Sequence, residues 1–139
     1  MSNGPWVPTD AFRAKLADEG VRSGSASWKV ALFTSASNLS EASTDYASVT
    51  GEVANGNGYT TGGISVTLTV TGTTSVTIAL SAVPQFTASG GSITARYAAL
   101  YEASDDIAAI CLLDDTPADV TAAPTESIQV TTTDVFALA

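Results

Sequence analysis

Apolar and hydroxyl-bearing side chains alternate along residues 64–80, and this alternation restricts the fold more than any other feature of the chain. The apolar residues occupy every second position on either side of a short break at residues 72–74: Ile64, Val66, Leu68 and Val70, then Val76, Ile78 and Leu80. Successive side chains of a β-strand point to opposite faces of the sheet. The segment is therefore predicted to form an antiparallel hairpin with an apolar core face and a hydroxyl-rich solvent face.

Several other short segments have the composition of strands, and Gly, Pro, Ser or Asp separate them. We predict further strands at residues 28–33, 84–88, 93–102, 107–113 and 128–138. Residues 114–125 are predicted to be a loop. Short strands separated by turns are typical of a β-sandwich, so the expected fold class is all-β, a jelly-roll-like antiparallel β-sandwich with one short N-terminal helix.

The N-terminal residues differ in character from the strands that follow. Pro5 and Pro8 predict an extended arm, and either Thr9 or Asp10 can cap a short helix that Gly20 ends. We therefore divide the chain into an arm with a short helix at residues 1–26 and a β-sandwich domain at residues 27–139.

The net charge of -9 is unevenly distributed along the chain. Residues 1–29 contain four of the five basic residues and three acids, whereas residues 30–139 contain Arg96 and eleven acids. An acidic body repels phosphate, so we expect no direct nucleic-acid partner. The N-terminal segment is either a docking segment or an ordinary helix with solvated charges. As a docking segment it offers six candidate partner contacts: Trp6, Phe12, Arg13, Lys15, Leu16 and Arg22. Of these, Trp6, Phe12 and Leu16 have no evident place in the sandwich.

The sequence offers little catalytic or metal-binding chemistry. The chain has no histidine and one cysteine, so the usual general base of Ser and Cys hydrolases and the usual zinc ligands are missing. Cys111 lies in the apolar run of residues 107–113 and is predicted to be a buried hydrophobic residue. The Gly-rich segment 55–63 lacks the spacing of a nucleotide loop and is predicted to be a turn. We expect no enzymatic activity, no catalytic residues, no cofactor and no metal.

Two weaker ligand hypotheses remain open from the residues alone. Asp114, Asp115 and Asp119 could hold calcium weakly, although they lack the spacing of a dedicated loop. The four tyrosines could either form a sugar-stacking platform or pack in the core and at interfaces: Tyr46, Tyr59, Tyr97 and Tyr101.

The sequence shows no signal for secretion or for membrane insertion. The first twelve residues contain no Lys or Arg, and no apolar stretch of the signal-peptide type follows them. The apolar run of residues 107–113 is too short to cross a bilayer. We expect synthesis in a cytoplasm and no membrane partner.

Four segments give the chain a resemblance to a known protein family. They are Trp28-Lys-Val-Ala-Leu-Phe33, Tyr46-Ala-Ser-Val-Thr-Gly-Glu-Val53, Gly58-Tyr-Thr-Thr-Gly-Gly63 and Arg96-Tyr-Ala-Ala-Leu-Tyr101. Together they resemble the jelly-roll cement, or decoration, proteins of tailed-bacteriophage capsids. The resemblance implies a non-enzymatic virion protein on the outer capsid surface, made in the host cytoplasm. Its partner would be the major capsid protein, and it would stabilise the joints between capsid subunits.

The oligomeric state and two alternative functions complete the expectations. Residues 107–113 are apolar on both faces and need a cover, which could be the second sheet, the helix or a twin subunit. We favour a homodimer, because two-fold dimers are the commonest closed assemblies. The alternative functions are a small carbohydrate-binding or adhesin-type β-sandwich that presents Tyr59 to a glycan, and another phage virion component from the tail or a head fibre.

Overall fold

The computed structural model describes residues 4, 6–10, 12–14, 27–73, 75–102, 106–114, 116, 118–130 and 136–138. Its strands are β1 (Val7–Pro8), β2 (Trp28–Phe33), β3 (Ile64–Val66), β4 (Leu68–Thr71), β5 (Val76–Leu80), β6 (Gln85–Thr87), β7 (Ile93–Ala95), β8 (Tyr97–Glu102), β9 (Ile107–Leu112), β10 (Val120–Ala122), β11 (Ser127–Gln129) and β12 (Phe136–Leu138). The described helical residues are residues 10 and 12–14. The all-β prediction is therefore confirmed.

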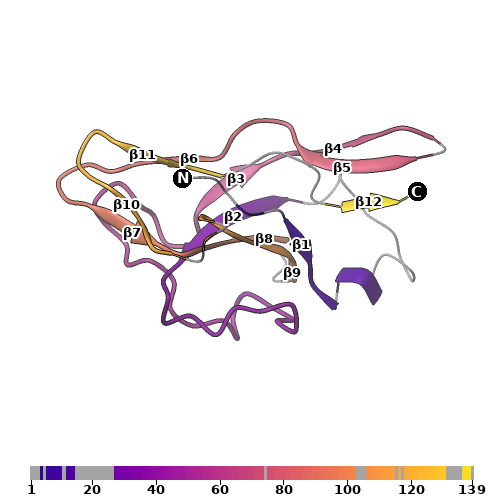
Figure 1. Ribbon diagram of the computed structural model, residues 1–139, viewed down its shortest axis with the longest axis horizontal. Helices are drawn as coiled ribbons and strands as arrows, with labels where there is room; N and C mark the ends of the chain where they lie inside the picture. Colours follow the sequence, from indigo (N-terminus) through magenta and orange to yellow (C-terminus); the bar gives the residue numbers. More distant parts are fainter. Residues whose placement is uncertain are drawn as a thin grey trace.

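The strands pair antiparallel in one larger sheet and three smaller ones. The larger sheet has five strands in the order β1-β9-β8-β2-β3. The smaller sheets are β12-β5-β4, β11-β6 and β10-β7. In Figure 1, β4, β5, β6 and β11 lie along the top of the molecule, and β2, β8 and β9 lie below them. This arrangement is that of a β-sandwich.

The main hydrophobic core lies between these two layers. Alternating residues of β2 and β8 point into it from below, and β4, β5, β6 and β11 supply the side chains from above: Val30, Leu32, Ala98 and Leu100 meet Leu68, Ile78, Leu80, Phe86 and Ile128. These residues are buried because the period-two pattern places one side of each strand in the core.

The other face of the larger sheet is covered by the long connection between β2 and β3. In Figure 1 the first part of this connection lies at the bottom of the molecule. Its Leu39, Tyr46 and Val49 belong to a second hydrophobic cluster, with Phe33 and Ile107 of the sheet. Strand β9 is therefore covered on both faces within one chain. The apolar face on which the expectation of a homodimer rested does not need a twin subunit, and the homodimer stays a prediction without that support.

The hairpin at residues 64–80 follows the predicted alternation but is divided between two sheets. Strand β3 pairs with β2, whereas β4 pairs with β5, and Thr67 lies between β3 and β4. Leu68 and Ile78 are buried, but Val70 is 46% exposed. The prediction that Val70 lies in the core is therefore wrong. Val70 follows the same alternation as the buried Leu68, but the core does not cover this end of β4.

This difference along one strand predicts a contrast between two truncations. L68A is expected to lower the free energy of unfolding by about 2–5 kcal/mol, because it leaves a cavity in a close-packed core. V70A is expected to change it by less than about 1 kcal/mol, because the removed methyl groups are already near water. Urea denaturation of both variants measures the contrast. Equal losses would contradict the exposed position of Val70.

Pairing between distant segments changes four predicted boundaries. The predicted strand at residues 93–102 is two strands: β7 pairs with β10, and β8 pairs with β2 and β9. The predicted loop at residues 114–125 contains β10, which pairs with β7. The predicted closing strand at residues 128–138 is two strands, β11 and β12, which pair with β6 and β5. Residues 7–8, predicted as part of an arm, form β1 at the edge of the larger sheet. Part of the predicted arm thus belongs to the sandwich.

Candidate docking surfaces

The N-terminal segment lies along the outer edge of β9 as an added strand. Val7 is the register partner of Ile110, and Pro8 is the partner of Ala109. The Gly4 amide donates a hydrogen bond to the Leu112 carbonyl at 2.8 Å, which extends the pairing beyond β1. A strand added at a sheet edge satisfies backbone groups that would otherwise be open to another chain.

Two of the predicted partner contacts are core residues instead. Trp6 and Phe12 are each 5% exposed and belong to the main hydrophobic core. The Phe12 ring meets the Trp28 ring edge-on, with their centroids 6.3 Å apart. The expectation that these two aromatic residues have no place in the sandwich is therefore wrong. Burial leaves their side chains unavailable to a partner while the segment stays docked.

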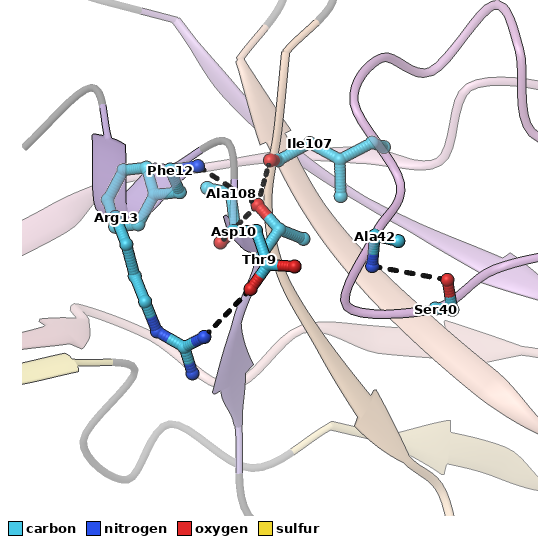
Figure 2. Close-up of polar contacts among 8 residues, drawn as sticks. All are labelled: Thr9, Asp10, Phe12, Arg13, Ser40, Ala42, Ile107 and Ala108. Atoms are coloured by element: carbon cyan, nitrogen blue, oxygen red, sulfur yellow. Dashed lines mark hydrogen bonds and ion pairs between the residues drawn. The ribbon is translucent and has the colours of Figure 1, made fainter.

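Thr9 fixes the point at which the added strand turns into the helix (Figure 2). Its hydroxyl donates to the Ile107 carbonyl at 2.7 Å and accepts a hydrogen bond from the Phe12 amide at 3.2 Å. Its amide donates to the Ala108 carbonyl at 2.9 Å. Thr9, rather than Asp10, is thus the N-cap, and the same hydroxyl attaches the cap to β9.

The remaining predicted contacts divide into one exposed residue and three that lie outside the described residues. Arg13 is exposed and forms an ion pair with Asp10, with 3.0 Å between the guanidinium nitrogen and the carboxylate oxygen. Exposed pairs at this spacing contribute little stability. Lys15, Leu16 and Arg22 lie outside the described residues.

The Gly-rich turn is held against the sheet by the carboxylate of Glu52. One carboxylate oxygen accepts a hydrogen bond from the Tyr46 hydroxyl. The other accepts from the Tyr59 hydroxyl and from the Gly62 amide, each at 2.6 Å. The Tyr59 hydroxyl also accepts a bond from the Leu32 amide at 3.1 Å. Glu52 therefore has a structural role, and sequence reasoning did not single it out because its three donors come from three separate points of the chain.

The tyrosines around Glu52 do not form an exposed platform. Tyr59 is 2% exposed and its ring packs against Phe86. Tyr101 is also buried, and its ring stacks on Tyr46 with centroids 4.5 Å apart. Burial raises the pKa of Tyr59, and the hydrogen bond to Glu52 raises it further. Its hydroxyl therefore stays protonated as a donor to the carboxylate.

Cys111 is a buried packing residue. Its side chain is buried in the main core, and burial raises the pKa of its thiol to about 12. A thiol with a raised pKa is largely protonated near neutral pH and is a poor nucleophile. The prediction of a buried hydrophobic cysteine is confirmed.

Two of the three acids predicted as weak calcium ligands have other partners. Asp114 accepts hydrogen bonds from the amide and the hydroxyl of Thr116, which lower its pKa. Asp119 forms an ion pair with Arg96 at 2.9 Å. Asp115 is not described. Within the described ranges, no group of three Cys, Asp or Glu residues lies close enough to hold a metal ion.

The solvent side of the upper layer carries an ordered set of neutral polar side chains. We call it the hydroxyl–amide face, and it consists of Thr69, Thr71, Gln85, Thr87, Ser127 and Gln129. The strands that carry it lie along the top of Figure 1. Cross-strand hydrogen bonds order the side chains of its β6 and β11 part: the hydroxyls of Thr87 and Ser127 are 2.8 Å apart, and the Gln85 amide donates to Ser127 at 3.0 Å.

This face is free of charge in a strongly acidic protein. Residues 53–95, which include β3 to β7, contain no Asp, Glu, Lys or Arg, and neither does β11. The nearest charge along the chain is Glu126, in the turn before β11. Two exposed large hydrophobic residues, Val70 on β4 and Val83 between β5 and β6, belong to the same uncharged stretch. The arrangement can therefore accept a partner without the desolvation of charges.

No family model, curated protein or solved structure matches this chain. Among the described residues, no helix is long and apolar enough to cross a membrane.

Proposed function

We propose that this chain is a non-enzymatic structural protein of a tailed-bacteriophage virion. It binds the outside of the capsid through the hydroxyl–amide face and stabilises joints between major capsid protein subunits. The observation that carries the proposal is the ordered, uncharged face on a body with a net charge of -9. The sequence resemblance to capsid cement proteins gives the partner its identity.

The charge distribution supports docking through this face. Exposed charges interact over about 8 Å at physiological ionic strength. An acidic surface would therefore repel an acidic partner and would lose hydration on contact. The centres of protein interfaces are depleted in charged residues, and the hydroxyl–amide face has this composition. Its hydrogen-bonded side chains also lose little conformational freedom on binding.

The N-terminal residues have a smaller part in this proposal than the sequence alone predicted. Trp6 and Phe12 stabilise the sandwich from within the core. Arg13 is exposed and can add a contact at the rim of an interface. Lys15, Leu16 and Arg22 stay proposed contacts on the basis of sequence.

The test of the face places two negative charges on it. The double variant T71E/Q85E should bind shells of the phage's major capsid protein about tenfold more weakly or worse, because docking would remove the two added charges from water. The matched control is S35E/A42E, which adds the same charge at exposed positions of the connection that covers the opposite face. Co-sedimentation with shells over a concentration series measures both affinities.

Two outcomes would count against the proposal. Equal weakening by both double variants would mean that net charge, and not the face, controls binding. Absence of the chain from purified virions would contradict the capsid role itself. The adhesin-type alternative has less support, because burial of the Tyr59 ring leaves no exposed ring there for a sugar. A glycan array tests that alternative directly.

A further inference from the structure

We propose that the edge of β9 accepts the N-terminal segment of a second copy of this chain, so that copies link by exchanging residues 4–13. This proposal concerns a self-interaction and does not depend on the capsid role. Exchange of an identical element between copies creates a dimer without any new contact surface.

The first step of the argument is the nature of the contacts that hold the segment. The backbone bonds from Gly4 and Thr9 reach Leu112 and Ala108, both at positions more than 90 residues away in sequence. The hydroxyl bond from Thr9 reaches Ile107. Because none of these contacts depends on the local continuity of the chain, the segment of a second copy can make every one of them.

The second step is the specificity of the site. Along the chain, Trp6 precedes β1 and Phe12 follows it. Both side chains are buried in the main core, and the Phe12 ring meets the Trp28 ring. The two aromatic residues lie three positions before and three positions after Thr9, where the strand turns into the helix. A segment fits this site only if it has the same pattern. The occupant that meets this requirement is another copy of residues 4–13.

The third step is reach. In the sheet order, β1 lies three strand spacings from β2, which is about 14 Å. The chain from Ala14 to Ser27 can span at most about 45 Å when extended. This maximum span exceeds both the distance from β1 to β2 and the diameter of a small domain, which is about 30 Å. A segment can therefore lie on the β9 edge of an adjacent copy while its own β2 stays in place.

The fourth step sets the conditions. A short connection holds the chain's own segment near β9 at an effective concentration in the millimolar range. Exchange therefore competes poorly in dilute solution. It becomes substantial when copies are held side by side or when the protein is refolded at high concentration.

Disulfide trapping between two full-length chains tests the exchange. Both chains carry C111A, one carries V7C and the other carries I110C. Paired residues of antiparallel strands have Cα atoms about 4.5–5.5 Å apart, which suits a disulfide. A mixed disulfide between residues 7 and 110 can form efficiently only when the segment of one chain lies on β9 of the other. The chains are refolded together at about 1 mM, where exchange competes with self-docking, and are then oxidised.

The control pair is V7C with T121C, which measures random collision with an exposed site on β10. We expect the V7C and I110C mixture to give about tenfold more covalent heterodimer than this control at millimolar concentration. A yield equal to that of the control would overturn the proposal. The single chain V7C/I110C should form an internal disulfide and thereby show that the substitutions preserve the register. If I110C does not fold, the pair P8C and A109C repeats the test one register position further.

Discussion

Replacement of Gly63 by alanine is expected to prevent folding. A Cβ atom at this position would lie 1.8 Å from the Val30 carbonyl oxygen and 2.8 Å from the Ala31 Cα. Both are backbone atoms of β2, which cannot move away without breaking its pairing with β8. The backbone at Gly63 also has a φ of +79°, which L-residues rarely adopt. We expect the G63A variant to lack the cooperative unfolding transition of the wild type.

The matched control for this prediction is G90A. Gly90 has the same φ of +79°, but a Cβ atom there would have no neighbour within 4 Å. The variant therefore carries the backbone strain without the clash, and it should lose only about 1–2 kcal/mol. Far-UV circular dichroism and urea denaturation of both variants give the comparison. A folded G63A protein as stable as G90A would contradict the close approach of the turn to β2.

Removal of the Glu52 carboxylate is expected to cause the second-largest loss. In E52A, the hydroxyls of Tyr46 and Tyr59 and the amide of Gly62 all lose their charged acceptor. A hydrogen bond to a charged group contributes about 1.5–3 kcal/mol, and a donor left unsatisfied in the protein costs further free energy. Because the three bonds share one acceptor and are not additive, we expect a total loss of about 3–5 kcal/mol in the free energy of unfolding.

The control for this loss is E126A. The Glu126 carboxylate accepts a hydrogen bond from the Ala123 amide in an exposed turn. Its removal should change stability by about 0.5 kcal/mol. Thermal and urea denaturation of the two variants measure the difference. Similar small losses in both would mean that Glu52 does not hold the Gly-rich turn in solution.

The local features of the fold could be predicted from the sequence because they depend on near neighbours in the chain. Strand β2 has the predicted bounds. The alternation of apolar residues along β4 and β5 correctly predicted that Leu68 and Ile78 lie in the core. Thr9 was one of two predicted helix caps. Each of these depends on the side-chain period of a strand or on the amides of the next helical turn.

The tertiary structure decided which distant segments meet, and this determines the candidate docking surfaces. Alternation assigns a residue to one face of a strand but does not say how far the opposite layer extends, so it placed the exposed Val70 in the core. It also does not say that the N-terminal segment pairs with β9 and buries Trp6 and Phe12. The Glu52 cluster likewise joins residues whose spacing carries no pattern. Contacts of this kind depend on backbone hydrogen bonds and shape complementarity between elements far apart in sequence, which the order of side chains along one strand does not specify.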